Sequence, residues 1–477
     1  MGLGGGGTAY LTGYEALFVN PANLFIQEKN YKLQITLLQG GYYFDSLLPV
    51  NGNHDRFNRY RDVIHHYDPA RGIITLDDGS RNQLLERSFN DTRIKGEFSI
   101  LTDFTWLGLK WVRPERSYAL AMRTRMASRY EIGRGNFTSI PNELNGNILL
   151  DQSLRQRYEV FHELSFGFAE SFTYLNGLAP KLSEFIIGAA PKIVVAGSHI
   201  DALYTNRYEF NNENGFWNQD LGFQQTSSGA VSDYAEDVFI HAGTPSESPV
   251  YSLSDLLQPS GIGAGLDIGI TYLITFDDDL SMLRHQNEPT EKSLRISFSV
   301  TDLGAIYHFK SPLTIESESV DIDTNRISQP TPYLYQGAPN EHISFLSRLE
   351  DFQILNQSIT SQSKSFETLL PLTVNTGGLL HYKRLKVMGD LSYSIIQSAF
   401  RPSGFSSYLG IEVRPLQYLP IRAGTRLAPH LQGFYSLGTG VETGWFDLNA
   451  SFLFKSKNNT PTSEILGASV IGFKVYL

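Results

Sequence analysis

Apolar and polar residues alternate along much of this chain. In the clearest run, polar and apolar side chains take turns at every position of residues 293–300. Comparable runs occupy residues 31–37, 118–126, 385–395 and 446–455. Successive side chains of a β-strand point to opposite faces, so each run predicts a strand with one apolar and one polar face.

Segments of this character recur from one end of the chain to the other. Several are about ten residues long or longer, the length of a tilted strand that crosses a membrane, whereas soluble strands usually have roughly 5–6 residues. There are sixteen candidate segments, and one or two of them belong to loops or form part of a longer strand. We therefore assign about fourteen to the wall of one barrel. The candidates are residues 31–44, 94–111, 116–129, 157–172, 184–198, 199–210, 217–226, 262–276, 293–309, 370–382, 384–397, 404–414, 418–428, 432–442, 444–455 and 464–477.

The connections between these strands are of two kinds. A tight turn that contains Pro114 lies at residues 113–116, and short helical stretches are expected at Ser252–Leu257 and Phe345–Phe366. Short turns on one side and long loops on the other are typical of an all-β transmembrane antiparallel barrel with long extracellular loops. The long connections lie near residues 46–92, 130–156, 211–260 and 310–368.

The chain ends within a predicted strand, as expected of a strand that closes a barrel. Its apolar face and its penultimate aromatic residue are formed by Ile471, Phe473, Val475, Tyr476 and Leu477.

The composition agrees with this fold class. There are 42 Gly, 25 Tyr and 30 Phe, and only 18% of the residues are charged, against about 25% in average proteins. The absence of Cys excludes disulfides, thiol catalysis and Cys-ligated metals. The net charge of −10 argues against nucleic-acid binding, which needs a concentrated basic face.

The first residues do not read as a signal peptide. Met1 is followed by Gly-Leu-Gly-Gly, and neither a basic region nor an apolar core is present. We therefore expect that the protein is exported to the bacterial outer membrane by a signal peptide absent from this numbering.

Two short motifs near the N-terminus resemble a known family. A glycine-rich stretch with Thr8 and Ala9 is followed by Asn20, Pro21 and Ala22. This pairing resembles the mature N-terminus of the FadL/PorV superfamily of outer-membrane β-barrels. The resemblance implies an N-terminal hatch inside the lumen, formed by residues 1–30, and a barrel formed by residues 31–477. The glycines of the motif are Gly4, Gly5 and Gly7.

Other stretches extend the resemblance over most of the chain. They begin at residues 184, 263, 300 and 370, and they look like an uncharacterised branch of the superfamily found in bacteria with a type IX secretion system. The acidic stretch 277–292 departs from that pattern, because relatives have a shorter turn there.

Five arginines on predicted polar faces are candidate lumen-facing charges. Lipid-facing arginine would cost roughly 2–4 kcal/mol at the bilayer midplane, so these side chains should point inward. They would then either form salt bridges that fill the lumen or make an anion-attracting constriction. The five are Arg123, Arg125, Arg295, Arg422 and Arg426.

No motif points to a cofactor. Gly2, Gly4 and Gly7 match a dinucleotide-binding spacing, but no strand precedes them. The calcium-loop opening at 321–325 has Arg326 where glycine is required. We therefore expect no cofactor.

Acidic and histidine clusters remain weak metal candidates. Residues 277–279 with Glu288 read as a solvated acidic loop, and His54, His65 and His66 lack a spacing that would converge them. The sequence also lacks a nucleophile elbow, so we expect neither a metal site nor an enzyme.

Two functions stay open. The first is a structural or interaction subunit of a larger outer-membrane secretion or assembly complex, as the PorV resemblance implies. The second is a FadL-like channel for hydrophobic small molecules. The expected partners are outer-membrane lipid, other outer-membrane or surface proteins, and a small hydrophobic ligand in the second case, but no nucleic acid.

Overall fold

The computed structural model describes most of the chain. The described residues are 2–29, 31–46, 95–136, 148–171, 183–211, 216–233, 253–276, 291–317, 320–323, 359–428, 433–456 and 463–477.

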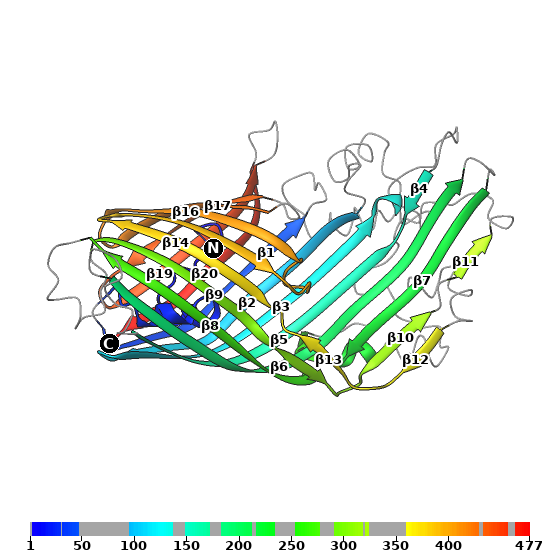
Figure 1. Cartoon of the computed structure of the whole chain (residues 1–477), viewed down its shortest axis with the longest axis horizontal. Coiled ribbons are helices and arrows are strands. Elements are labelled where there is room, and N and C mark those ends of the chain that lie inside the picture. Colours follow the sequence, from blue (N-terminus) through cyan, green and yellow to red (C-terminus); the bar gives the residue numbers. More distant parts are fainter. Residues whose placement is uncertain are drawn as a thin grey trace.

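Within these residues, fourteen antiparallel strands form a closed barrel (Figure 1). The predicted fold class and strand number are confirmed. In the order in which they pair, the wall strands are β1 (Leu33–Ser46), β2 (Lys95–Val112), β3 (Arg116–Gly133), β5 (Leu154–Ser171), β6 (Ser183–Asn211), β8 (Gly261–Thr275), β9 (Lys292–His308), β14 (Thr373–Tyr382), β15 (Leu385–Ser394), β16 (Gly404–Leu416), β17 (Leu419–Leu427), β18 (Phe434–Glu442), β19 (Phe446–Ser456) and β20 (Ser463–Tyr476).

The last strand pairs with the first and closes the ring. Ile35 lies opposite Val475, and Leu37 lies opposite Phe473. The terminal Leu477 extends this ladder, since its backbone N–H donates to the carbonyl of Leu33 at 2.8 Å. Closure leaves no free edge in the wall, which is what a sheet in lipid requires.

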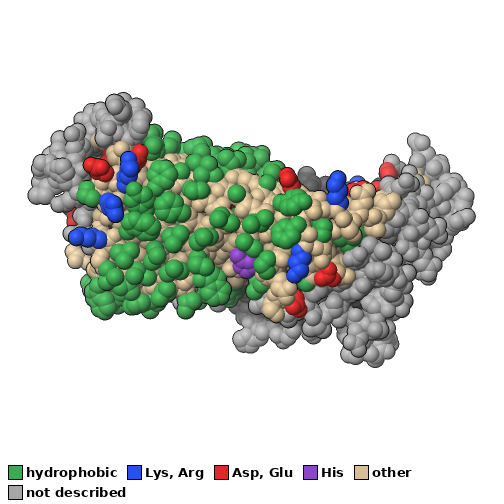
Figure 2. Space-filling view, turned by 90° about the horizontal axis from the view of Figure 1, so that it is seen from below, with side chains coloured by type: hydrophobic (Ala, Val, Ile, Leu, Met, Phe, Trp, Pro, Cys, Tyr) green, Lys and Arg blue, Asp and Glu red, His purple; other side chains and the backbone are tan. Residues whose placement is uncertain are grey.

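The two faces of the wall differ as the alternation predicts. In β9, Ser293, Ser297 and Ser299 are buried toward the lumen, whereas Ile296 and Phe298 are exposed on the outside. Figure 2 shows apolar side chains covering the face of the barrel that is in view. An exposed apolar surface of this extent is suited to lipid and not to water, so the barrel spans a membrane.

The helices of the described residues are short. They include the 3₁₀ turns η1 (Tyr14–Phe18) and η2 (Pro21–Phe25) and the helix α4 (Leu253–Leu257), which lies in the helical stretch predicted at Ser252–Leu257. In the described part of the chain no helix is both long and apolar enough to cross a bilayer.

One side of the wall continues far beyond the barrel (Figure 1). The first half of β6 pairs with β8, and its second half pairs with β7 (Phe216–Ser228). The separate strands predicted at 184–198 and 199–210 are therefore one strand. A β-bulge near Ala196–His199 interrupts the alternation without ending the strand.

The regions predicted as long loops contain further strands. These strands are short and pair with β6, β7, β9 or one another, and no lipid-facing apolar pattern marks them in the sequence. The helix predicted at 345–366 is wrong in its described part, because pairing with β10 draws residues 359–362 into a strand. The added strands are β4 (Ile148–Asp151), β10 (Leu313–Ser317), β11 (Val320–Asp323), β12 (Ile359–Gln362) and β13 (Phe366–Leu369). The strand predicted at 217–226 is β7, which lies in the extension and not in the wall of the barrel. Most of the loop predicted at 46–92 lies outside the described residues.

The two ends of the barrel can be told apart by their connections. Tight turns join β2 to β3, β14 to β15, β16 to β17 and β18 to β19, and the C-terminus lies at this same end. We name it the short-turn end. Barrels of this class place short turns on the periplasmic side, so the extension lies on the outside.

Candidate functional site

Residues 2–29, the N-terminal segment, lie inside the barrel. The Gly4 N–H donates to Ser436 Oγ of β18 at 2.8 Å. Lys110 of β2 donates to the Thr12 carbonyl at 2.7 Å, and Ser299 of β9 donates to the Val19 carbonyl at 2.6 Å. Because these strands lie on different sides of the ring, the segment spans the lumen between them.

The glycine-rich start of the segment packs closely against the wall of the barrel. Gly4 and Gly5 have φ angles of +81° and +94°, a region that only glycine adopts freely. A Cβ on Gly4 would also meet the backbone of Thr425. Beyond this turn, the backbone N–H groups of Gly7 and Thr8 donate to one carboxylate oxygen of Asp390 at 2.5 and 3.2 Å. Asp390 thus fixes the turn to β15.

The Gly-Thr-Ala and Asn-Pro-Ala motifs contact each other. Asn20 begins η2, where its side-chain oxygen accepts from the Ala22 N–H at 3.2 Å. Its amide nitrogen donates to the Thr8 carbonyl at 3.0 Å and to Thr271 of β8 at 2.9 Å. Ala9 and Ala22 are fully buried, so a larger side chain at either position would not fit. Pro21 opens η2 with its fixed φ.

An apolar cluster holds the middle of the segment against β3, β5 and β6. The wall supplies mostly small side chains at this place, which lets the segment approach closely. The cluster comprises Tyr14, Ala16, Leu17, Ala22, Leu24, Phe25, Ile26, Ala119, Ala121, Ala169, Ile186, Ala190 and Leu273.

The five candidate arginines all have polar or ring partners inside the barrel, and three of them contact the N-terminal segment. Arg295 donates to Glu28 at 2.7 Å, and Lys386 donates to the other oxygen of Glu28 at 2.6 Å. The guanidinium of Arg123 stacks on the Phe18 ring with 3.6 Å to the centroid. Glu28 is thus the ionic link from the segment to β9 and β15.

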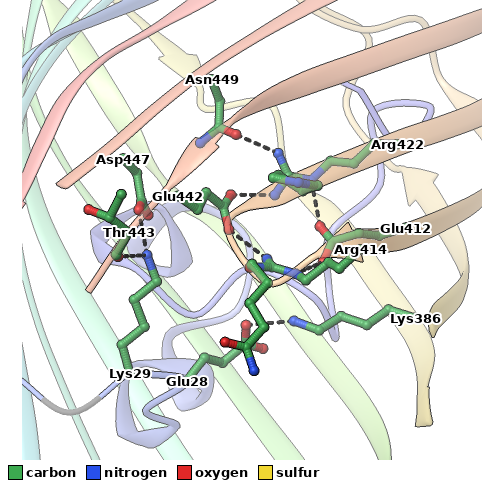
Figure 3. A network of polar contacts seen from close by, with 12 residues as sticks. Glu28, Lys29, Lys386, Glu412, Arg414, Arg422, Glu442, Thr443, Asp447 and Asn449 are labelled. Atoms are coloured by element: carbon green, nitrogen blue, oxygen red, sulfur yellow. Dashed lines mark hydrogen bonds and ion pairs between the residues drawn. The ribbon is translucent and has the colours of Figure 1, made fainter. Parts of the chain in front are cut away.

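Arg422 is the centre of a second network near the short-turn end (Figure 3). Its guanidinium donates to Glu412 at 2.6 Å, to Glu442 at 2.5 Å and to the Tyr10 hydroxyl at 3.1 Å. Arg414 donates to the same two carboxylates at 2.8 and 2.5 Å. Each arginine is therefore neutralised by shared carboxylates, and the network binds Tyr10 to the wall.

The remaining two arginines lie apart from the segment. Arg125 forms a bidentate pair with Asp302 at 3.0 and 2.8 Å. Arg426 donates to the Tyr43 hydroxyl at 2.5 Å and lies over the Phe434 ring. These contacts place both arginines within the lumen, where they bridge strands.

Burial and charge shift the pKa values of the segment's own groups. Burial alone would raise the pKa of Glu28, but Lys386 and Arg295 outweigh it, so this pKa lies well below its ordinary value. Burial lowers the pKa of Lys29, although its ion pair with Asp447 opposes the shift. Burial also raises the pKa of Tyr10 well above its ordinary value.

The Glu28 pairs predict a pH-dependent attachment of the segment. Their contribution is fully present above the ordinary pKa of 4.5 and is lost as the pH falls through the lowered pKa of the docked state. A nitroxide at Thr12→Cys should therefore gain mobility in electron paramagnetic resonance only well below pH 4.5. Glu28→Gln should raise that mobility already at neutral pH. Identical curves for both proteins would show that Glu28 does not hold the segment.

A cavity of about 570 Å³ lies beside the N-terminal segment. It runs from Lys29 and Asp447, near the short-turn end, to Asp103 and Arg123 deeper in the barrel. Gly40, Gly41 and Gly438 also line it. The segment therefore does not fill the lumen on the side of β1, β2, β18 and β19.

A further buried ion network joins side chains of neighbouring wall strands, on the long-loop side of the N-terminal segment. Lys192 of β6 donates to Asp267 of β8 at 2.8 Å and to Asp302 of β9 at 2.5 Å. Arg125 connects this group to Glu163 at 2.6 Å. Charges buried this deeply are tolerated only when each has a partner.

Sequence reasoning did not single out Glu28, Asp390, Lys192, Asp267 or Asp302. Asp267 and Asp302 do lie in stretches on which the family resemblance rests, and this was the available signal. Their partners come from strands far apart in the chain, so no local spacing could reveal them.

Among the described residues, no group of His, Asp or Glu side chains could hold a metal ion. The candidates at His54, His65, His66, 277–279 and Glu288 lie outside those residues. Asp321 and Asp323 lie in β11, and Asn325 lies outside the described chain.

The fold and the filled lumen define a class: a membrane-spanning β-barrel with an internal N-terminal segment. The chain belongs to the family of unknown function DUF5723, whose model matches residues 50–415. No curated protein matches the sequence.

Solved structures similar to this chain are barrels of low sequence identity. One is the toluene transporter TodX of P. putida, with a TM-score of 0.42, 11% identity, and 100% of this chain and 97% of that chain covered. Another, the TodX deltaS2S3 mutant monoaromatic hydrocarbon channel, has a TM-score of 0.45, 10% identity, and coverage of 100% and 97%. A FadL homologue of Pseudomonas aeruginosa has a TM-score of 0.39, 11% identity, and coverage of 98% and 93%.

Proposed function

We propose that the protein is a plugged outer-membrane channel that takes up small apolar molecules, with the N-terminal segment as its hatch. The observation that carries the proposal is an apolar cluster inside the lumen, on the long-loop side of the hatch. A water-filled pore would have polar walls at this place. The cluster comprises Ala127, Phe161, Val194, Ala196, Ile306, Leu370, Ala399 and Phe400.

The attachment of the segment supports a hatch that can shift. Its bonds to Ser436, Asp390 and Arg295 join single polar groups to the wall, and water could replace each of them. None of the strand pairings of the wall uses residues 2–29. The segment can therefore move without opening the barrel.

A disulfide lock tests the channel. A Cβ built on Gly2 lies 3.4 Å from the Cβ of Ser451, close to the usual separation of about 3.5–4.5 Å in disulfides. The natural chain has no Cys, so Gly2→Cys with Ser451→Cys adds the only pair. Cells that produce the wild type should take up the apolar dye N-phenyl-1-naphthylamine faster than cells without the protein. The oxidised double variant should return uptake to background.

Reduction of the double variant should restore uptake, and Gly2→Cys alone should behave like the wild type. Equal uptake with and without the protein would refute the channel. Full uptake by the oxidised variant would refute the hatch only.

A second candidate is an interaction subunit of an outer-membrane complex, including the type IX secretion context of the resemblance. The sheet extension formed by β4, β7, β10, β11 and β12 favours it, because it projects beyond the barrel on the long-loop side (Figure 1). Detergent pull-down of the wild type, compared with a variant that lacks residues 320–323, tests this role. A partner lost in the variant would support it, and recovery of the barrel alone would count against it.

A further inference from the structure

The connection between β15 and β16, residues 395–403, turns into the lumen, and we call it the inner loop. Ser398, Ala399 and Phe400 at its tip are buried, while Ile395 and Arg401 on either side are exposed. A turn closes the tip, since the Ser398 N–H donates to the Arg401 carbonyl at 2.9 Å. The buried part of the loop is therefore a compact insertion of three residues.

The inner loop reaches strands elsewhere on the ring. The Ala399 N–H donates to the Glu159 carboxylate of β5 at 3.0 Å. Gln397 donates to Glu131 of β3 at 3.0 Å. Four wall strands, β6, β8, β9 and β14, separate β5 from β15 in the ring. The loop thus crosses the lumen on the long-loop side of the N-terminal segment.

The Phe400 ring occupies an apolar seat inside the barrel. Its centroid lies 5.0 Å from that of Phe161, and the Arg125 guanidinium lies 4.9 Å from it. Val194, Ala196, Ile306 and Leu370 belong to the same buried cluster. The seat therefore surrounds one benzyl group with apolar side chains and one cation.

We propose that the inner loop is a second plug, and that Phe400 holds the place of an apolar solute with a single aromatic ring. The size and lining of the seat match such a ring, and a cation over its face adds attraction. The buried network of Arg125, Lys192 and Asp302 closes the seat toward the N-terminal segment. A solute from the long-loop side would stop at this seat. The proposal rests on the proposed function for the nature of the solute.

Side-chain hydrogen bonds, and not strand pairing, hold the tip of the inner loop. Glu159 and Arg129 bond to its backbone, Gln397 bonds to Glu131, and Arg401 bonds to Ser392. A solute that fills the seat also replaces the apolar contacts that Phe400 loses. Loop and solute therefore compete for one place, which lowers the apparent affinity for the solute.

Toluene binding to purified protein in detergent tests the competition without any transport. Ser403 is exposed on the inner loop, so a single environment-sensitive fluorophore on Ser403→Cys reports loop movement. Toluene should change its fluorescence in a saturable way. Phe400→Ala in this background should tighten the apparent affinity by about tenfold, because the ring no longer competes.

The matched control is Phe405→Ala, since Phe405 is 62% exposed on the lipid face of the next strand. It should leave the toluene affinity unchanged. Absence of a saturable response, or equal affinities in the Phe400→Ala and Phe405→Ala proteins, would overturn the second plug. If toluene binds but cells take up no dye, the channel is refuted and the seat stands. If cells take up dye but the loop does not respond to toluene, the seat is refuted and the channel stands.

Discussion

Lys192→Met should destabilise the barrel by about 3–5 kcal/mol, the cost of removing one partner from a buried charge group. The Lys192 ammonium donates to both oxygens of Asp267, at 2.9 and 2.8 Å, and to Asp302 at 2.5 Å. The Lys192 and Asp267 side chains are almost completely buried. Without the ammonium, two carboxylates would face each other with only Arg125 to compensate. Urea unfolding in detergent, followed by heat-modifiable gel migration, measures the loss.

Two further variants separate charge from packing. Lys192→Met with Asp267→Asn removes both members of a pair and should recover part of the stability. Arg116→Met breaks the exposed pair with Glu170 at 2.7 Å and should cost far less stability, because solvent screens this pair. If Lys192→Met were no more damaging than Arg116→Met, the buried network would have no structural importance.

The wall strands could be predicted because the alternation that identifies each of them lies within the strand itself. A strand between lipid and lumen must alternate, and residues 293–300 show which face each side chain takes without knowledge of any partner. The same alternation indicates that Arg295 points inward, because it shares a face with Ser293, Ser297 and Ser299. It cannot indicate Glu28 as its partner, since Glu28 precedes the first strand and 267 positions separate the two residues.

The short strands of the extension could not be predicted for a related reason. Strands outside the lipid need no apolar face, so β10, β11 and β12 carry no alternation long enough to separate them from loops. Their existence depends on pairing with β7, which comes from an earlier part of the chain. The inner loop could not be predicted either, because the sequence pattern predicts one strand over residues 384–397. β15 ends at Ser394, after which the chain leaves the wall for the lumen.

Deleting residues 2–24 tests how many plugs the lumen has. The wall should still assemble, because β1 and β20 pair without any of these residues. A barrel of fourteen strands is wide enough for its lumen to hold water once the segment is gone. The inner loop should nevertheless keep the long-loop side closed, so the deletion alone should raise single-channel conductance only slightly. Replacing residues 396–402 with a short glycine-containing turn should likewise have little effect alone.

The two changes together should raise the conductance several-fold over either single variant, because the lumen is then open from the short-turn end to the long-loop side. Planar-bilayer recordings of heat-modifiable, and therefore folded, protein measure the four combinations. A full increase from the N-terminal deletion alone would mean that the inner loop does not obstruct the lumen. A doubly altered barrel that stays closed would mean that another part of the protein closes the lumen, and the two elements could not then be its only plugs.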